Sequence, residues 1–180
     1  IAGMFEQSSD LPFNTLVVIG PTGELVTSYR KIHLYDSFGY RESQRLAPGP
    51  IEPVVVKVAD LQIGLMTCYD LRFPELARAL VDRGAEALVV PAAWVAGENK
   101  VHHWRTLLQA RAIENTVWTI GVGQSGDRYC GHSLVCDPQG TIVDEATESE
   151  ELLSAVVRPA AVKESREVNP SLANRRIRST

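Results

Sequence analysis

The chain has 180 residues, and its 18 Lys and Arg against 22 Asp and Glu give a net charge of −4, with no basic stripe for nucleic acid and no polybasic patch for a membrane surface. Hydrophobic residues make up 44% and charged residues 22%, which is typical of a folded globular domain and not of a disordered chain. No apolar run approaches the roughly 20 residues that cross a bilayer, and three cysteines without a CxxC spacing fit a reducing, cytoplasmic compartment better than a disulfide framework.

Two short hairpins are predicted, one in each half of the chain. The first joins strands at residues 16–20 and 24–29 across the turn Pro21-Thr22-Gly23. The second joins strands at residues 134–136 and 141–143 across the turn Pro138-Gln139-Gly140. The shared Pro-x-Gly turn predicts that the two hairpins take comparable places in a layered fold.

Between these hairpins the predicted strands and helices alternate. Strands are expected at residues 53–58, 62–67, 87–91 and 116–122, and helices at residues 74–83 and 101–115. Pro74 stands in the first turn of one helix and Gly84 follows its end. Trp104, Leu108 and Ala112 share one face of the other helix. This order of elements predicts an α/β layered protein.

The C-terminal part of the chain is more polar. After Glu150 we expect a strand at residues 152–157 and then a polar tail, residues 163–180, extended over the surface or over a neighbour. No linker or low-complexity stretch divides the chain. One domain over residues 1–160 is therefore predicted, with residues 161–180 as a C-terminal extension that packs on the domain or on a partner subunit.

Cys68 is the candidate nucleophile because of its place in the predicted sheet. It ends an apolar strand and precedes a short polar turn, so its thiol projects from the carboxyl end of the strand, where α/β sheets bind ligands. The backbone N–H of Tyr69 is then placed to face an oxyanion. Position alone leaves open that Cys68 is a buried small hydrophobe, which is our interpretation of Cys130 and Cys136.

A thiol needs a neighbouring cation or base to become a thiolate, and the histidines show no spacing that marks one of them for this task. His102 and His103 are adjacent on one helix and so point in different directions. His33 and His132 lie near strand ends, where hydrogen-bonded structural roles are expected. A Cys/His pair stays open on these grounds.

Lys31 and Glu42 are the other candidates for the site. Lys31 lies at the end of a hairpin strand, and near Cys68 it would lower the thiol pKa and donate to a developing oxyanion. Glu42 would orient that lysine or the substrate. Taken alone, Lys31 also fits a solvated residue and Glu42 an exposed loop acid.

Four stretches of the chain combine these candidates into longer motifs. They are Tyr29-Arg-Lys-Ile-His-Leu34, Gly39-Tyr-Arg-Glu-Ser43 with Ala47-Pro-Gly49, Gly64-Leu-Met-Thr-Cys-Tyr-Asp-Leu-Arg-Phe-Pro-Glu75, and Trp104 through Arg111-Ala-Ile-Glu-Asn115. In this order, and over nearly the whole chain, they resemble the nitrilase superfamily of carbon–nitrogen hydrolases. The motif after Cys68 resembles the branch that contains deaminated-glutathione amidase and omega-amidase, and it departs from true nitrilases, where Trp-Glu usually follows the cysteine.

The resemblance implies a four-layer αββα sandwich and thioester chemistry without a metal or an organic cofactor. Cys68 would match the nucleophile that attacks the amide carbon. Lys31 and the Tyr69 backbone N–H would stabilise the tetrahedral intermediate, and Glu42 would position the lysine and the substrate.

One part of the family pattern has no match in this chain. The general-base glutamate of the family lies on an early strand, well before the lysine, so the sandwich is expected to be incomplete at its N-terminus and this chain alone to be inactive. Glu6 matches a later strand end and is not interpreted as the base. Glu75 opens a helix, where an acid favours the N-terminus, and is also not interpreted as the base.

Two residues are candidates for substrate binding. Arg72, close to Cys68 in sequence, presents a planar fork that suits a carboxylate, although a salt-bridged surface arginine fits equally well. Trp94 follows a buried strand and would wall a pocket or pack in the core.

We therefore expect a hydrolase that cleaves a non-peptide C–N bond of a small linear amide and releases ammonia. Nitrile, carbamoyl or acyl-transfer chemistry on the same scaffold stays open, as does a catalytically inactive binding or oligomerisation module. The resemblance further implies a homodimer or higher homo-oligomer, with residues 74–83 and 159–180 as the expected interface, and no nucleic-acid or membrane partner.

Overall fold

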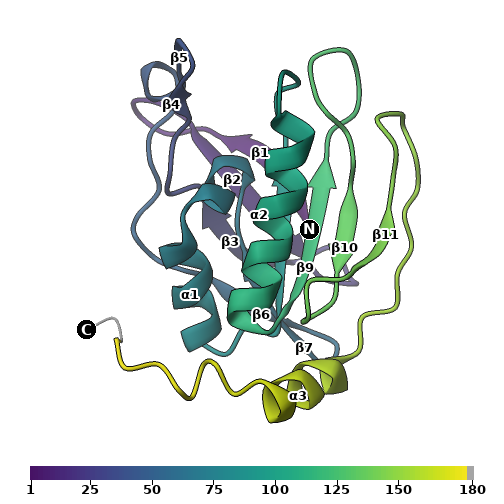
Figure 1. Cartoon of the computed structure of the whole chain (residues 1–180). Helices are drawn as coiled ribbons and strands as arrows, with labels where there is room; N and C mark the ends of the chain where they lie inside the picture. The colour runs from purple at the N-terminus through teal and green to yellow at the C-terminus, as the bar shows by residue number, and fades with distance from the viewer. Residues whose placement is uncertain (178–180) are drawn as a thin grey trace.

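A computed structural model describes residues 1–177, which form two facing sheets and a layer of helices (Figure 1). The smaller sheet is antiparallel and contains β1 (Ala2–Glu6), β2 (Phe13–Ile19) and β3 (Leu25–Arg30). Alternate residues of β2, such as Leu16 and Val18, are buried against the second sheet, as expected for a strand with one covered face.

The larger sheet has the strand order β11-β10-β9-β8-β7-β6. Its strands are β6 (Val55–Val58), β7 (Leu61–Leu65), β8 (Ala87–Ala92), β9 (Trp118–Gly123), β10 (Leu134–Cys136) and β11 (Ile142–Glu145). The central strands β7, β8 and β9 are parallel, and the outer pairs are antiparallel. Because both faces of β8 are covered, its residues form an almost continuous buried run.

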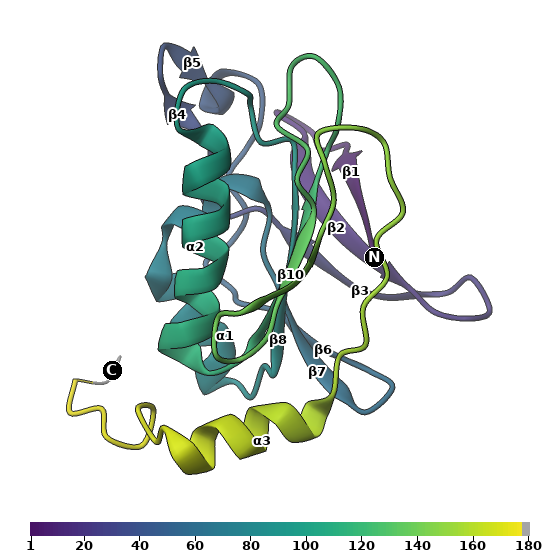
Figure 2. The same ribbon diagram turned by 45° about the vertical axis from the view of Figure 1, so that its right-hand side comes forward.

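Two helices cover the face of the larger sheet that points away from the smaller one (Figure 2). Helix α1 (Pro74–Asp82) starts with Pro74 in its first turn, and Gly84 follows its end at a φ of 94°. Helix α2 (Lys100–Asn115) buries Trp104 and Leu108. No helix within residues 1–177 combines the length and the apolar character that crossing a membrane requires.

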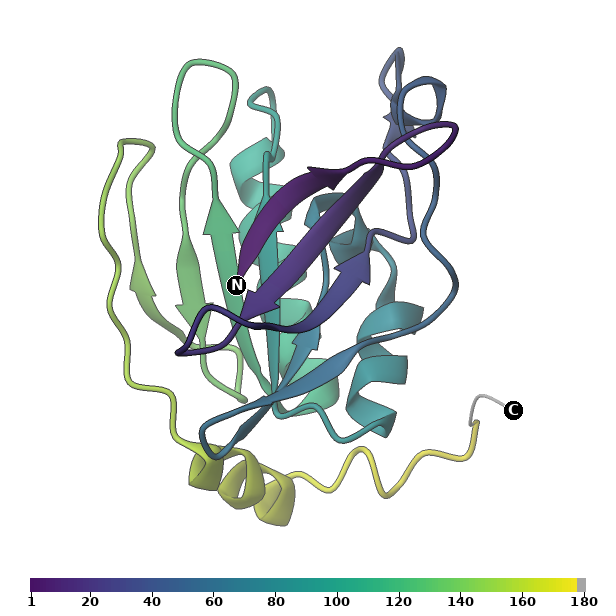
Figure 3. The same cartoon turned by 180° about the vertical axis from the view of Figure 1, so that it is seen from behind.

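The layers of the described residues are therefore helices, larger sheet and smaller sheet. Seen from behind, the smaller sheet lies in front of the larger one, and no helix within residues 1–177 covers its outer face (Figure 3). The helix α3 (Pro159–Val168) lies instead across one end of the larger sheet. Both predicted hairpins form, one in each sheet: β2 with β3, and β10 with β11.

Two predictions for the C-terminal part are wrong. Residues 152–157 form no strand, and Leu152 and Val156 are 92% and 78% exposed. No strand in the described part of the chain pairs with this segment, so its backbone would lack ladder partners. The polar tail, expected to be extended from residue 163, is helical as far as Val168. Pro159 starts helix α3 ahead of it, and Ala161 and Val162 of this helix pack on Trp118.

Residues 169–177 follow α3 without further helix or strand. They run back along the domain, and the guanidinium of Arg175 forms a bidentate ion pair with Asp82 of α1. The predicted tail also includes residues 178–180, which lie outside the described residues.

Three strands were not predicted. The apolar start of the chain forms β1, which pairs with β2 from Ala2 opposite Val17. The two-residue strands β4 (Asp36–Ser37) and β5 (Tyr40–Arg41) form a small hairpin at the edge of the molecule. Strands this short carry too little alternation to be recognised from sequence.

Gly121 of β9 marks the closest approach of helix α2 to the larger sheet. A Cβ added there would lie 2.7 Å from Trp104 Cζ2 and would collide with the Leu108 side chain. We expect Gly121→Ala to lower the free energy of unfolding by about 1–3 kcal/mol through overpacking, as measured by urea denaturation. Gly3→Ala is the control: its Cβ would lie 3.7 Å from Leu16, an ordinary contact, and its effect should stay within about 0.5 kcal/mol. Equal stabilities of the two variants would contradict this packing.

Candidate active site

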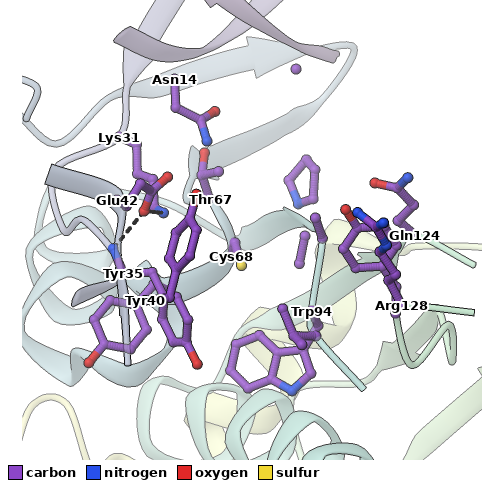
Figure 4. Close-up of a pocket in the computed structure, with 18 of the residues that line it drawn as sticks. Asn14, Lys31, Tyr35, Tyr40, Glu42, Thr67, Cys68, Trp94, Gln124 and Arg128 are labelled. Atoms are coloured by element: carbon purple, nitrogen blue, oxygen red, sulfur yellow. Dashed lines mark hydrogen bonds and ion pairs between the residues drawn. The ribbon is translucent and has the colours of Figure 1, made fainter. Parts of the chain in front are cut away.

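A cavity of about 1180 Å³ opens at the end of the sheets where β7 and β8 finish (Figure 4). Its walls come from strands β1 and β2, from the segment around Lys31, from the β4–β5 hairpin and from the loops that follow β7, β8 and β9. Of the six residues proposed from sequence, all line this cavity: Lys31, Glu42, Cys68, Tyr69, Arg72 and Trp94. The fold thus brings to one cavity six residues that span 63 positions, from Lys31 to Trp94.

Cys68 sits on a sharp turn after β7. It opens a short 3₁₀ turn, Cys68–Arg72, and its own backbone has a φ of 47°, a left-handed conformation that residues with a Cβ rarely adopt. The sulfur points into the cavity (Figure 4). One side chain of α2 supports the same turn, since the Arg111 guanidinium donates two hydrogen bonds, of 2.8 and 3.1 Å, to the Leu71 carbonyl.

The environment of Cys68 favours the protonated thiol. Burial raises its pKa to about 11, because a thiolate loses its hydration there. The charge of Lys31 and the backbone N–H of Tyr69 act in the opposite direction, whereas Glu42 and Asp70 raise the pKa further. Lys31 is therefore the main group that favours the thiolate, and the thiol needs a base to react near neutral pH.

Lys31 and Glu42 form a buried ion pair beside this thiol. Lys31 is 2% exposed, and its Nζ lies 2.5 Å from Glu42 Oε2. The same oxygen accepts the backbone N–H of Tyr35, also at 2.5 Å. Glu42 is thus neither an exposed loop acid nor free, because it fixes the lysine and one end of the β4–β5 hairpin.

Arg72 and Trp94 form one wall of the cavity. The Arg72 guanidinium lies over the Trp94 ring at 5.0 Å, and one of its nitrogens is 3.4 Å from His103 Nδ1. Arg72 makes no ion pair with any residue of the described range 1–177, in contrast to a salt-bridged surface arginine. Trp94 packs on Trp104 and is 4% exposed, so it belongs to the core and to the cavity wall at once.

The two acids that were set aside, Glu6 and Glu75, do not line the cavity. Hydrogen bonds from Arg30 and Thr15 to the Glu6 carboxylate lower its pKa to about 2. Glu75 lies in the first turn of α1. Neither residue is placed to take a proton from Cys68.

Cys130, Cys136, His33 and His132 have surroundings that fit the structural roles expected for them. Cys130 and Cys136 are buried and unpaired. His33 Nδ1 lies 2.8 Å from Asp70, and His132 Nδ1 lies 3.1 Å from Glu145. Within residues 1–177, no three His, Cys, Asp or Glu side chains gather as ligands for a metal ion.

Sequence reasoning missed the rim of the cavity. Tyr35, Phe38 and Tyr40 form an aromatic cluster on the β4–β5 hairpin, and Lys100 Nζ lies 4.1 Å from the Phe38 ring. The only signal for this rim was three aromatic residues within six positions of a predicted loop. Sequence reasoning also gave no role to Asp70, which stands two residues after Cys68.

Comparison with known proteins gives a consistent assignment. A family model described as carbon–nitrogen hydrolase matches residues 1–167. Two relatives from Escherichia coli are 45% identical over 165 residues, or 92% of this chain: protein YbeM of strain K12 and a deaminated glutathione amidase of O157:H7. The chain covers 88% of the length of YbeM and 63%, less than two thirds, of the length of the amidase.

The fold is similar to that of Nit3 from Saccharomyces cerevisiae, a member of branch 10 of the nitrilase superfamily. The TM-score is 0.85 at 31% sequence identity, with 97% of this chain and 64% of Nit3 covered. The predicted α/β fold of the nitrilase type is thereby confirmed.

The ion pair beside Cys68 makes a direct prediction for thiol reactivity. Lys31→Met removes the cation that favours the thiolate and leaves Glu42 unpaired, so the thiol pKa should rise. At about pH 9 we expect iodoacetamide to alkylate Cys68 about three- to tenfold more slowly, because a more basic thiolate partly offsets its lower population. Mass spectrometry of the Cys68 peptide measures the rate. Lys57→Met, at an exposed site on β6, is the control and should leave the alkylation rate of Cys68 unchanged. If Lys31→Met reacted as fast as the wild type, the role of Lys31 would be contradicted.

Proposed function

Because the chain belongs to the carbon–nitrogen hydrolase family, within the nitrilase superfamily, we propose that it cleaves the C–N bond of a small linear amide through a thioester on Cys68. The observation that carries this proposal is one cavity that contains the sulfur of Cys68 and the buried Lys31–Glu42 pair. The deaminated glutathione amidase of Escherichia coli O157:H7 is longer than this chain, which covers 63% of its length.

The first half of the reaction forms the thioester. The Cys68 thiolate attacks the amide carbon, the C–S bond forms, and the carbonyl oxygen becomes an oxyanion. Lys31 Nζ and the Tyr69 backbone N–H are the proposed donors to that oxyanion. Collapse breaks the C–N bond, and the proton taken from the thiol leaves with the nitrogen as ammonia.

The second half of the reaction hydrolyses the thioester. A water molecule loses a proton to the general base and attacks the thioester carbon, and the C–S bond breaks to release the carboxylic acid. Lys31 and Tyr69 stabilise the second oxyanion in the same way. Glu42 contributes by holding Lys31 in place, since a lysine fixed before the reaction needs no reorganisation when charge develops.

The general base is the missing part of this scheme. Among the described residues that line the cavity, only Glu42 and Asp127 carry carboxylates. Glu42 is engaged by Lys31 and by the Tyr35 N–H, and Asp127 lies on an exposed loop. We therefore propose that the 180-residue chain, taken alone, turns over slowly or not at all.

The charges around the cavity suggest a substrate with a carboxylate besides its amide. Arg45, Arg72, Lys100 and Arg128 line it along with Lys31, against the two carboxylates Glu42 and Asp127. Arg72 is the proposed partner of the substrate carboxylate, because its guanidinium is held flat on Trp94 and has no ion pair within residues 1–177 to give up.

The other expectations for the protein stay predictions. A homodimer through α1 and the segment after Arg158 rests on the resemblance, and so does a cytoplasmic location. Tyr69-Asp70, in place of Trp-Glu, favours an amide over a nitrile as substrate. A catalytically inactive module is the competing interpretation, which the following experiment addresses.

Ammonia release tests the proposed chemistry. We compare the 180-residue chain with a form extended at its N-terminus by a segment that supplies a glutamate. The extended form should release ammonia from small amides, and Cys68→Ala should lower its kcat by roughly 10³-fold or more, because the nucleophile is lost. Cys130→Ala, a buried cysteine outside the cavity, is the matched control and should retain activity.

Two results would overturn this scheme. Ammonia release that survives Cys68→Ala would exclude the thioester on Cys68. Absence of both ammonia and an acylated Cys68 in the extended form would favour the inactive module instead.

Substrate charge gives a second test in the extended form. Arg72→Gln should lower kcat/KM for an amide that carries a carboxylate by about 10- to 100-fold, as expected for loss of a charged hydrogen bond. For a neutral amide of the same length the change should stay within about threefold. Equal losses on the two amides would show that Arg72 does not read the carboxylate.

A further inference from the structure

Asp70 is the most enclosed charged group near the cavity. Its side chain is fully buried, and its two oxygens accept four hydrogen bonds from two segments of the chain. Oδ2 accepts from the Tyr29 hydroxyl at 2.7 Å and from the Thr67 backbone N–H at 2.9 Å. Oδ1 accepts from the His33 backbone N–H at 3.1 Å and lies 2.8 Å from His33 Nδ1.

These partners flank the two groups that the proposed reaction needs side by side. Tyr29 and His33 stand two residues before and two residues after Lys31. Thr67 precedes Cys68 directly, and Asp70 itself stands two residues after it. One carboxylate thus ties both sides of the lysine to both sides of the cysteine, across 37 and 41 positions of sequence.

The same carboxylate also closes the strained turn of the nucleophile. The Asp70 side chain accepts the Thr67 N–H while the Asp70 N–H donates to the Thr67 carbonyl at 3.0 Å. Cys68 lies inside this double closure with its positive φ of 47°. A strained backbone persists only where its surroundings hold it, and these hydrogen bonds are the restraint.

Direct chemistry by Asp70 is excluded by its surroundings. It does not line the cavity, and both oxygens are occupied by donors. Burial, with the nearby Asp70 charge, keeps the pKa of Tyr29 above its usual value, so the Tyr29 hydroxyl keeps its proton and stays a donor. The His33 ring is held in turn by stacking on Phe73, with centroids 3.8 Å apart.

We propose that Asp70 is a positioning residue that sets Lys31 against Cys68, acting through Tyr29, His33 and the backbone of Thr67. This inference deepens the proposed function and rests on it for the roles of Lys31 and Cys68. Removal of the carboxylate should uncouple the lysine from the thiol even in a protein that remains folded.

A double-mutant cycle on thiol reactivity tests this coupling in the 180-residue chain. The rate of Cys68 alkylation by iodoacetamide at about pH 9 is measured for the wild type, Lys31→Met, Asp70→Asn and the double variant. Asp70→Asn also lowers the Cys68 pKa by removing a nearby negative charge. This effect is the same with Lys31 or with the Lys31→Met substitution, so it cancels when the two rates are compared. Cooperative thermal unfolding verifies that each variant is folded.

We call the slowing of Cys68 alkylation by Lys31→Met the lysine effect, and we expect Asp70→Asn to abolish it. Lys31→Met slows alkylation about three- to tenfold when Asp70 is present, and by less than about 1.5-fold in the Asp70→Asn background. Asp144→Asn, an exposed acid on β11, is the matched control and should leave the lysine effect at full size. The same slowing in both the wild-type and the Asp70→Asn backgrounds would overturn the proposal.

A second pair of variants decides the matter if Asp70→Asn does not fold. Tyr29→Phe removes one donor, and His33→Phe removes another while keeping an aromatic ring to stack on Phe73. With both in place, the lysine effect should fall by at least about half, and an undiminished effect would overturn the proposal.

This readout is independent of turnover. Suppose that Lys31→Met loses its effect on alkylation in the Asp70→Asn background, but the extended form never releases ammonia. This result would support the positioning role of Asp70 and refute amide hydrolysis. If Lys31→Met slows alkylation equally in both backgrounds and the extended form does release ammonia, the positioning role alone is refuted.

Discussion

The buried carboxylate of Asp70 is the constraint on which the geometry of the site depends. A carboxylate removed from water is costly unless its oxygens are hydrogen-bonded, and here four donors compensate for the lost hydration. Those donors come from the end of β3 and from the turn after β7, which belong to different sheets. This one buried group therefore links the ends of the two sheets beside the cavity.

The cavity that results combines a protonated thiol with a lysine that is already paired. Burial raises the pKa of Cys68. The charge of Lys31 lowers this pKa, and the charge of its partner Glu42 partly cancels that effect. In the reaction proposed above, the Cys68 thiol would therefore react only when a base takes its proton. The outer wall, where Arg72 lies on Trp94, carries positive charge that no acid of residues 1–177 neutralises by an ion pair.

Most of the secondary structure followed from local patterns. Pro74 and Gly84 bound α1 as predicted, and the Pro-x-Gly turns at Gly23 and Gly140 form their hairpins with positive φ. The strand expected at residues 152–157 failed because β propensity without a neighbouring strand is not enough. Helix α3 was missed because its apolar face is narrow and contacts only the end of the sheet around Trp118.

Local sequence was enough to mark the candidate reactive residues and the kind of turn on which Cys68 stands. Cys68 ends an apolar strand before a polar turn, and Lys31 ends a hairpin strand, both of which are local facts. Packing of the two sheets brings these groups into one cavity, buries Glu42 against Lys31, and lets Asp70 join two segments of the chain. The reason is physical: burial and hydrogen-bond partners are properties of packed sheets, and residues 37 to 41 positions apart meet only after the sheets have packed.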